Sequence, residues 1–563
     1  MGRWSSGSDW QALLEQLVGW ASVTGTPAEA VFPEQLQALL RTLPYFQQHP
    51  HHLSLHPTGD GRHLLTALVR PPGPPRPETV VLLSHFDVVG VDDYGPLASL
   101  AFDPARLTRH LAAHRDEWAG AARADLETGA FLFGRGVMDM KGGLAAHLAL
   151  VAEAAEAAWS GNLLCLSVPD EEANSVGMRR ALDALAHIAA RERLDYRLVI
   201  NSEPIFPRFP GDATPYVYTG SIGKMLAGLY CVGQATHVGE PLAGLNANTV
   251  AAALTAALEW HDELVQRLGD EKTPPPTNLG LQGLSSRYSV QIPFRAVTLT
   301  NVLLFDEPLN SVLERMMAVA RSAVADLLAR YRRAVTTLGP AQGTPPMADV
   351  RLLTYEDLHR RAVAQAGPTA VAELVRNALS DAAGDERARG IRVVERLAAL
   401  CPDLAPMVVL FLAVPYYPAV NSADHPRVAR VLDRVNHTLQ AQGLAALVPQ
   451  AYYPGLSDLS FVGQRASAST RETVARLMPG WGRLYDLPDR DSILADVPGI
   501  NLGPVGFDAH RVTERINTAY VPKVLLPALR AAVAEALRPE EPEAPAPHPP
   551  DGPDSIARPN PAG

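Results

Sequence analysis

Three features are scarce in this chain, and each scarcity excludes a class of protein. Only 3 of the 563 residues are cysteine, too few and too widely spaced for a disulfide framework or a cysteine-ligated metal cluster. The strongest apolar run, residues 406–414, is far shorter than the roughly 20 residues that a membrane-spanning helix needs. Basic runs are missing as well, and the formal net charge of −11 argues against nucleic acid as a partner.

The remaining composition is that of a globular protein. Hydrophobic residues make up 47% of the chain, charged residues 19%, and the mean hydropathy is −0.01. A length of 563 residues exceeds what one hydrophobic core usually supports and predicts two or more domains. The first ten residues lack the apolar core of a signal peptide, so we expect a cytoplasmic protein without a membrane partner. Cys165, Cys231 and Cys401 lie mostly in apolar runs and are predicted to be buried free thiols.

Apolar runs of strand length alternate with helical patterns in the first 214 residues. Residues 79–90, 161–169 and 195–204 read as strands, and residues 142–160 read as a helix between the first two. This order predicts an α/β catalytic domain with a mostly parallel sheet flanked by helices. Functional residues of such a sheet collect on loops at the carboxyl ends of its strands.

The pattern changes after residue 214. Residues 215–356 contain strand and helix patterns that predict a separate small α+β unit, inserted into the catalytic domain. From residue 357 to 537 the αβ alternation of the catalytic domain is expected to resume, with 406–414 as one of its buried strands. Residues 538–563 are rich in proline and poor in large apolar residues, which predicts a disordered tail.

Acidic residues and histidines lie where the predicted strands end. Oxygen and imidazole donors without thiolates suit zinc or manganese, and several carboxylates are more than one tetrahedral ion needs. Two divalent ions bridged by a carboxylate would use them all. The spacing in "SHFD" places His85 and Asp87 on one side of a strand, so that Asp87 can hold the second imidazole nitrogen. The candidates are His85, Asp87, Asp139, Glu171, Glu172, Glu203 and His510.

Each motif by itself has a structural alternative. His85 could be a buried strand histidine, and residues 170–172 could begin a capped helix. The glycine-rich segment 134–143 could be a phosphate loop, although it lacks the P-loop spacing. The histidines at positions 49, 51, 52 and 56 lie in a proline-bounded loop, and we expect a solvated surface there rather than a metal site.

Six segments, in order, resemble the zinc-dependent metallopeptidase family twenty. This is the aminoacylase and carboxypeptidase G group, which includes succinyl-diaminopimelate desuccinylase and acetylornithine deacetylase. The segments are "LLSHFDVV", "GRGVMDMKGG", "PDEEANSVG", "INSEP", "GQATHVGEPLAGLNA" and "GPVGFDAHRVTERI", spread over roughly residues 80 to 520. The length, the loop "AYYPGLSDLS" and the ending "GPVGFDAHRVTERINTAY" look most like the RocB-type arginine-utilisation proteins.

The resemblance implies a zinc-exopeptidase-like fold whose inserted domain acts as a lid or dimerisation surface. It also implies two divalent metal ions per chain, zinc with cobalt or manganese as alternatives. The implied metal ligands follow the family's motifs: His85 and Glu203 bind one ion, Glu172 and His510 bind the other, and Asp139 bridges both. Glu171 is the implied general base, Asp87 is the catalytic-site aspartate that accompanies the metal-binding histidine, His237 donates to the oxyanion, and Asn246 contacts substrate.

The expected function is therefore a two-metal hydrolase that cleaves an amide or peptide bond in a small amino-acid derivative or short peptide, in connection with arginine catabolism. An N-deacylase or N-carbamoyl amidohydrolase is the alternative within this class, and a catalytically silent metabolite-binding protein is the alternative outside it. A homodimer through the lid is also expected. One departure concerns substrate binding: the arginine that the family carries late in a lid strand is missing, and Arg295 lies near the start of that strand.

Overall fold

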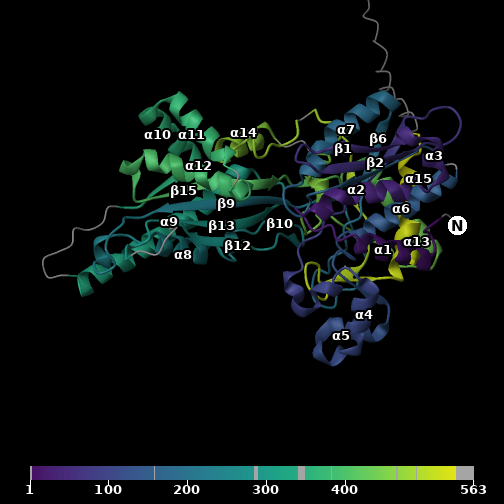
Figure 1. Ribbon diagram of the computed structural model, residues 1–563, viewed down its shortest axis with the longest axis horizontal. Coiled ribbons are helices and arrows are strands. Elements are labelled where there is room, and N and C mark those ends of the chain that lie inside the picture. The colour runs from purple at the N-terminus through teal and green to yellow at the C-terminus, as the bar shows by residue number, and fades with distance from the viewer. Residues whose placement is uncertain are drawn as a thin grey trace, which may run out of the picture.

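The computed structural model describes residues 3–157, 159–284, 290–339, 349–381, 383–463, 467–489 and 491–539. Two lobes lie side by side along the long axis of the molecule (Figure 1). One lobe holds the N-terminus and a large sheet, and the other holds a smaller sheet with its own helices. Of the tail predicted to be disordered, residues 540–563 lie outside the described residues.

The large sheet is parallel at its centre. Strand β3 pairs in parallel with β5 and with β6, and β6 pairs in parallel with β18. The three strands predicted in the first 214 residues are β3, β5 and β6, so that prediction and the α/β class are confirmed. The strand order is β1 (Leu53–Pro57), β2 (His63–Val69), β5 (Asn162–Val168), β3 (Glu78–His85), β6 (Asp195–Asn201), β18 (Gly499–Asn501), β7 (Tyr216–Tyr218) and β17 (Val448–Gln450).

Both faces of this sheet are covered, because alternate residues of its strands enter two different cores. Val80 and Leu82 pack with helices on one face, whereas Val81 and Leu83 pack with α7 (Val176–Glu192) on the other. Burial on both sides explains why these strands read as continuous apolar runs. The helices of the first face are α1 (Gly7–Gly19), α2 (Pro27–Leu40), α3 (Pro44–Gln48), α6 (Lys141–Glu156), α13 (Pro426–Ala441) and α15 (Leu526–Ala536).

The second lobe is built on a five-stranded sheet. Its strand order is β12 (Thr277–Gly283), β13 (Arg295–Leu304), β9 (Gly223–Val232), β15 (Met407–Tyr417) and β14 (Arg351–Thr354). Helices α8 (Ala247–Leu258) and α9 (Leu309–Leu338) contribute to the core on one face. The other face is packed by α10 (Tyr355–Ala366), α11 (Pro368–Ser380) and α12 (Glu386–Leu400).

The return to the catalytic lobe comes later than expected. Residues 406–414 were assigned to the catalytic sheet, but β15 pairs antiparallel with β9 and parallel with β14 in the second sheet. The expectation was wrong because strands of both sheets are buried on both faces, so a local apolar run cannot tell one sheet from the other. Only after residue 417 does the chain pair β16 (Val420–Asn421) with β8 (Gly220–Ser221) and rejoin the first lobe.

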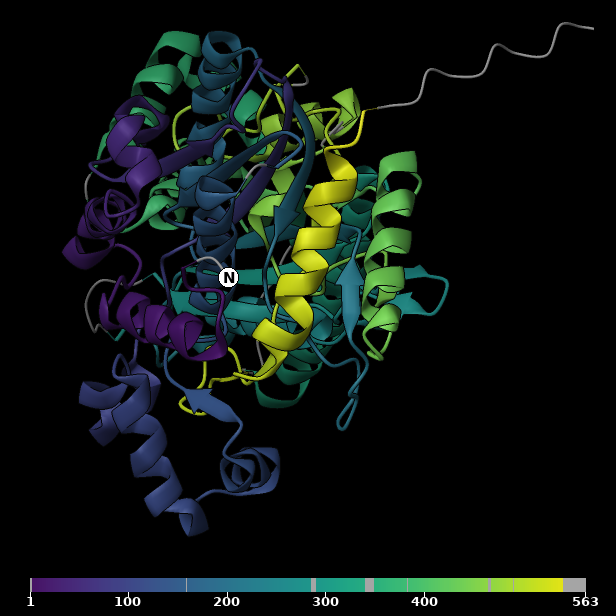
Figure 2. The same cartoon turned by 90° about the vertical axis from the view of Figure 1, so that its right-hand side faces the viewer.

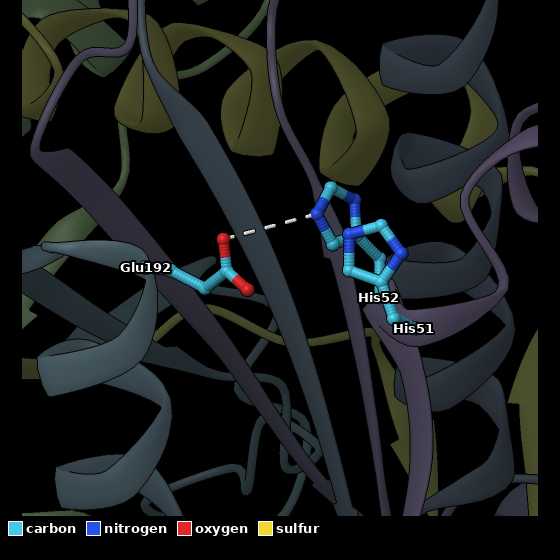
Figure 3. A group of neighbouring side chains, drawn as sticks. All are labelled: His51, His52 and Glu192. Carbon is cyan, nitrogen blue, oxygen red and sulfur yellow. Dashed lines mark ion pairs between the residues drawn. The ribbon is translucent and has the colours of Figure 1, made fainter.

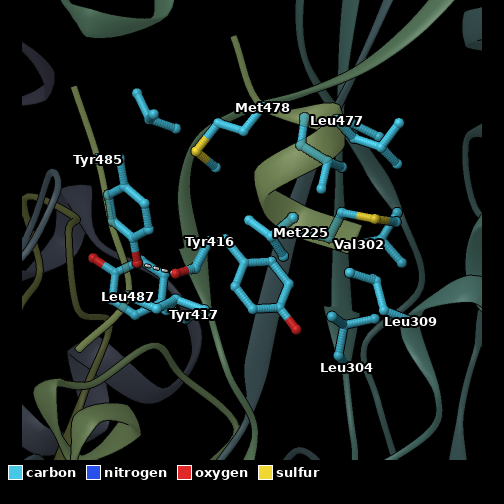
Figure 4. Close-up of a cluster of buried hydrophobic side chains, with 14 of the residues drawn as sticks. Met225, Val302, Leu304, Leu309, Tyr416, Tyr417, Leu477, Met478, Tyr485 and Leu487 are labelled. Carbon is cyan, nitrogen blue, oxygen red and sulfur yellow. Dashed lines mark hydrogen bonds between the residues drawn. The ribbon is translucent and has the colours of Figure 1, made fainter. Parts of the chain in front are cut away.

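The chain then visits the second lobe once more. Helix α14 (Ala468–Leu477) packs against β15, α9 and α10. The Thr473 hydroxyl lies 3.0 Å from Oδ1 of Asn310, and Arg476 pairs with Glu356 at 2.8 Å. Figure 4 shows Leu477 and the adjacent Met478 in the same buried cluster as Met225 and Val302 of the second sheet.

A helical excursion between β3 and α6 projects from the first lobe (Figure 2). It has a small core of its own around Tyr94, Leu107 and Phe133. Its end, β4 (Phe131–Phe133), joins β20 (Arg515–Asn517) and β19 (Gly506–Phe507) in a three-stranded sheet. The excursion comprises η2 (Asp92–Leu100), α4 (Pro104–Ala113), η3 (Arg115–Glu117) and α5 (Gly120–Thr128).

The remaining elements are short connectors: η1 (Pro50–His52), η4 (Pro241–Ala243), η5 (Asp262–Leu264), β10 (Arg267–Leu268), β11 (Glu271–Lys272), η6 (Pro402–Leu404), η7 (Asp458–Phe461) and η8 (Val521–Leu525). Cys165, Cys231 and Cys401 are buried free thiols, as predicted. Within the described ranges, none of the helices combines the length and the apolar character needed to cross a lipid bilayer.

Candidate metal centre

The candidate ligands converge at the carboxyl edge of the large sheet. His85 is the last residue of β3, Glu171 and Glu172 follow β5, and Glu203 follows β6. Asp139 precedes the first turn of α6, and His510 lies in the loop between β19 and β20. Because β5, β3 and β6 are parallel neighbours, their carboxyl ends bring these loops to one place.

Asp139 lies between the two histidines and faces each with a different oxygen. His85 Nε2 is 3.2 Å from Oδ1 of Asp139 and 3.3 Å from Oε1 of Glu203. His510 Nε2 is 3.3 Å from Oδ2 of Asp139 and 3.2 Å from Oε1 of Glu172. Two donor sets, each with one histidine and one glutamate, therefore share one carboxylate. The resemblance implied the same pairing, and the metal-binding roles of these residues stay predictions.

The cluster contains more buried carboxyl groups than histidines, and a bound cation would offset the repulsion between these carboxylates. Burial raises the pKa of Glu203 to about 8 and also raises that of Glu172. For His510, burial alone would lower the pKa, but hydrogen bonds to Asp139 and Glu172 raise it to about 11. Carboxylates and neutral imidazoles are ligands for divalent transition metals, so the residues present fit such ions.

Glu171 has one oxygen without a partner. Its side chain is buried, Oε1 makes no hydrogen bond within the described chain, and Oε2 is 3.8 Å from Nε2 of His85. Donor atoms of His85, Glu171 and Glu203 lie within 4.8 Å of one another, as do those of His85, Asp139 and Glu172. The geometry therefore places Glu171 in the cluster and is compatible with either role, metal ligand or general base.

Asp87 supports the cluster through the backbone. It accepts the N–H of Glu171 at 3.1 Å and that of Glu172 at 3.2 Å, and the Thr24 hydroxyl donates to it at 2.9 Å. Burial alone would raise the pKa of Asp87, but the neighbouring His85 imidazole, and then the hydrogen bonds from the Glu171 N–H and the Thr24 hydroxyl, lower it. The His85 Nδ1 atom is 3.6 Å from Oδ1 of Asp87 and closer, 3.0 Å, to the Asp87 carbonyl oxygen. Asp87 therefore fixes the glutamates more directly than the imidazole.

Asp170, the first acidic residue of the "DEE" run, serves the fold. It pairs with Arg62 at 2.7 Å and accepts the backbone N–H of Val176, the first residue of α7, at 3.1 Å. The alternative of a capped helix that begins at residues 170–172 is wrong, because α7 begins only at Val176, with Ser175 as its N-cap. Asp170 instead holds the turn before α7, while Glu171 and Glu172 enter the cluster.

Sequence reasoning missed the residue that holds the Asp139 loop. Glu514 is fully buried, pairs with Arg135 at 2.8 Å and accepts the backbone N–H groups of Gly136 at 2.7 Å and Met138 at 3.3 Å. These bonds shape the loop that presents Asp139. Only its place in the last of the six family-like segments indicates from the sequence that Glu514 belongs to the site.

The predicted lid residues stand apart from the cluster. His237 is exposed, and its Nδ1 accepts the N–H of Gly239 at 3.1 Å. Asn246 is the N-cap of α8 and accepts the N–H of Asn248 at 2.9 Å. Within the described chain neither forms a hydrogen bond or ion pair with the cluster, so their catalytic and substrate-binding roles stay predictions.

The histidine-rich loop is only partly the solvated surface that we expected. His51 is exposed, but His52 is buried, with Nε2 3.9 Å from Oε2 of Glu192 (Figure 3). Glu192 is already paired with Arg70 and Arg191, each at 2.9 Å, through different oxygens. Because two guanidinium groups already neutralise this carboxylate, we assign no metal site there.

Comparison with known proteins settles the family. A sequence profile of Peptidase family M20/M25/M40 matches residues 110–523. The chain is also 38% identical over 544 residues to Uncharacterized protein YqjN of Bacillus subtilis (strain 168), covering 96% of this chain and 98% of the relative. The chain belongs to Peptidase family M20/M25/M40. It is thus a metal-dependent hydrolase, as the resemblance predicted.

Within this M20 family the chain has RocB-like relatives. It is 28% identical over 534 residues to Protein RocB of Bacillus subtilis (strain 168), covering 92% of each chain. Its fold is similar to the M20 family metallo-carboxypeptidase Sso-CP2 from Sulfolobus solfataricus, with a TM-score of 0.53, 12% identity, and coverage of 94% of this chain and 100% of that one. This structural likeness confirms the α/β fold with an inserted domain.

Proposed function

We propose that this M20 hydrolase uses two divalent metal ions to cleave an amide or peptide bond in a small amino-acid derivative or short peptide. The observation that carries the proposal is the position of Asp139, whose two oxygens face His85 and His510 separately. Glu203 completes one donor set and Glu172 the other. Zinc suits this mixture of nitrogen and oxygen donors, with cobalt or manganese as alternatives.

When bound, the ions would supply Lewis acidity toward the scissile carbonyl and toward a water molecule. Glu171 is the proposed general base. Its Oε1, which makes no hydrogen bond among the described residues, takes the proton of the attacking water and returns it to the leaving nitrogen. Asp87 keeps Glu171 and Glu172 in their relative positions through their backbone N–H groups. His237 is proposed to donate to the oxyanion when the second lobe closes over the site.

The narrower assignments are also proposals. The similarity to Protein RocB over nearly the whole chain, together with the RocB-type segments of the sequence, supports a substrate related to arginine. An N-deacylase or N-carbamoyl amidohydrolase fits the same site, because all three reactions pass through attack on a carbonyl next to nitrogen. The homodimer through the inserted lobe stays a prediction.

Metal analysis combined with a substrate panel tests the proposal. Protein purified without chelator is expected to contain up to two zinc, cobalt or manganese ions per chain. The panel comprises N-acetyl, N-carbamoyl and dipeptide derivatives of arginine, ornithine and citrulline, with His85→Ala as the metal-deficient control. Protein that binds no metal, and hydrolyses nothing when each metal is added, would refute the proposal.

A further inference from the structure

A fully buried histidine, His147 of α6, joins the two strands that lead to one of the two donor sets, here called the first donor set. Its Nδ1 atom is 2.7 Å from the Ser84 hydroxyl on β3, and its Nε2 atom is 2.7 Å from the hydroxyl of Ser202, which follows β6. Ser84 directly precedes His85, and Ser202 directly precedes Glu203. The imidazole therefore links β3 and β6 at the residues next to two proposed metal ligands.

The directions of these hydrogen bonds follow from the partners of Ser202. Its hydroxyl donates to the carbonyl oxygen of Leu502 at 2.8 Å, so its single proton is already used. Nε2 of His147 must then donate to the Ser202 oxygen, and Nδ1 must accept from the Ser84 hydroxyl. Burial lowers the pKa of His147 to about 3, and the ring is neutral, with one donor and one acceptor. The network allows this ring a single orientation.

The helix that carries His147 also leads to the shared carboxylate. Helix α6 begins two residues after Asp139. A Cβ atom at Gly143 would lie 2.2 Å from the carbonyl oxygen of Ser202, so the first turn of α6 lies directly against the end of β6. His147 thus joins α6, β3 and β6, and each of these three elements leads to one donor of the first set.

Fold stability does not account for this polar network. Ser84 and Ser202 lie on the faces of their strands that carry Leu82 and Ile200 into the apolar core shared with α6. Buried hydrogen bonds replace bonds to water and add little net stability, and apolar groups of the same shape can replace both partners at little cost. The network contributes direction instead, because each bond fixes one strand end relative to α6.

The second donor set is held by other residues. Asp87 accepts the backbone N–H of Glu172 at 3.2 Å, and Glu514 accepts that of Gly136 at 2.7 Å in the loop that presents Asp139. These bonds do not involve the imidazole of α6. Loss of that imidazole should therefore disturb the first donor set much more than the second.

We propose that His147 is a positioning residue that sets the separation of His85 and Glu203 and thereby the metal affinity of the first donor set. The inference rests on the proposed two-metal function. Without the imidazole, the ends of β3 and β6 can shift relative to each other and to α6, and the two ligands then no longer meet one ion at the right distances.

Zinc titration of the full-length protein against a chromogenic chelator tests this role in two backgrounds, each of which keeps one donor set. Glu172→Gln removes a ligand of the second set, and Glu203→Gln removes a ligand of the first. We expect His147→Phe to weaken zinc binding roughly 10-fold in the Glu172→Gln background and by about twofold or less in the Glu203→Gln background. His147→Gln, whose amide offers one acceptor and one donor, should restore most of the affinity.

Asn162 supplies the matched control. It is fully buried, and its side-chain amide donates to the carbonyl oxygen of Glu78 at 3.2 Å, which links β5 and β3 at the ends away from the cluster. Asn162→Ala should lower the melting temperature of the zinc-free protein and leave zinc affinity unchanged in both backgrounds. If His147→Phe does not fold, the triple variant Ser84→Ala/His147→Phe/Ser202→Ala takes its place, since it leaves no hydroxyl of the network unpaired.

The possible outcomes separate the positioning role from the proposed function. Unchanged zinc affinity of His147→Phe in the Glu172→Gln background would overturn the positioning role and leave the proposed function intact. An equal loss in both backgrounds, or an equal loss in Asn162→Ala, would also overturn it, because the effect would then be one of general stability. Wild-type protein that binds no zinc would refute the proposed function itself, and the positioning role with it.

Discussion

The carboxylate of Asp87 accepts the backbone N–H of Glu171 at 3.1 Å, so the loop after β3 fixes the loop after β5. Its second oxygen does the same for Glu172 at 3.2 Å. Three consecutive acidic residues can coexist here because each faces a different cationic or imidazole group. Asp170 pairs with Arg62, Glu172 lies against His510, and Oε2 of Glu171 is 3.8 Å from Nε2 of His85.

Replacing Asp87 should therefore loosen the metal ligands without removing one. For Asp87→Ala we expect metal affinity to fall roughly 10- to 100-fold, because buried groups that orient ligands have effects of this size. Competition with a chromogenic chelator measures the affinity. Thr24→Val removes only one hydrogen bond to Asp87 and should have a smaller effect; equal metal affinity in wild type and Asp87→Ala would contradict the positioning role.

Substitutions of the two neighbouring glutamates should have different effects on metal content and activity. Glu171→Gln is expected to keep both metals and to lose activity by roughly 10³-fold or more, since the proposed base acts in both proton transfers. Glu172→Gln should lose one of the two metals. Elemental analysis measures the metal content of both variants, and steady-state kinetics measures their activity. Loss of metal in Glu171→Gln would assign it as a ligand, a position that its distance from His85 allows.

His237→Ala tests whether the exposed lid histidine takes part in the reaction. If it donates to the oxyanion, kcat should fall roughly 10²- to 10³-fold with metal content unchanged. His261→Ala, on the same lobe, is the matched control. Activity of His237→Ala within a factor of two of the wild type would remove His237 from the mechanism.

His52 should make the protein sensitive to mild acid. Burial lowers the pKa of His52 from 6.5 to about 4, so between these pH values the unfolded chain binds more protons than the folded one. The free energy of unfolding should therefore fall as pH drops from about 6.5 to about 4. Urea unfolding at pH 7 and pH 5 should show a smaller loss for His52→Gln than for the wild type. His51→Gln should show a loss between the two, because His51 also lowers the pKa of His52.

The sequence predicted the central strands of the large sheet and the acidic residues and histidines that follow them, because both leave local patterns. The roles of Asp139 and His510 came from the family resemblance, and all metal-binding roles stay predictions. Continuous apolar runs mark β3, β5 and β6, and acidic residues or histidines stand where these strands end. The sheet to which β15 belongs could not be predicted, since pairing with β9 joins residues 175 to 193 positions apart and leaves no mark in the apolar run itself.

Helix α14 has a consequence for how freely the second lobe can be exchanged. An insertion joined by two adjacent connections can be cut out or replaced as a module, but here the chain leaves the first lobe again to lay α14 on β15, α9 and α10. The Arg476 to Glu356 ion pair and the Thr473 to Asn310 contact fasten it there. Deleting or replacing the second lobe would expose the apolar face of α14. A substitution in the second lobe at its contact with α14 therefore requires a matching change in α14.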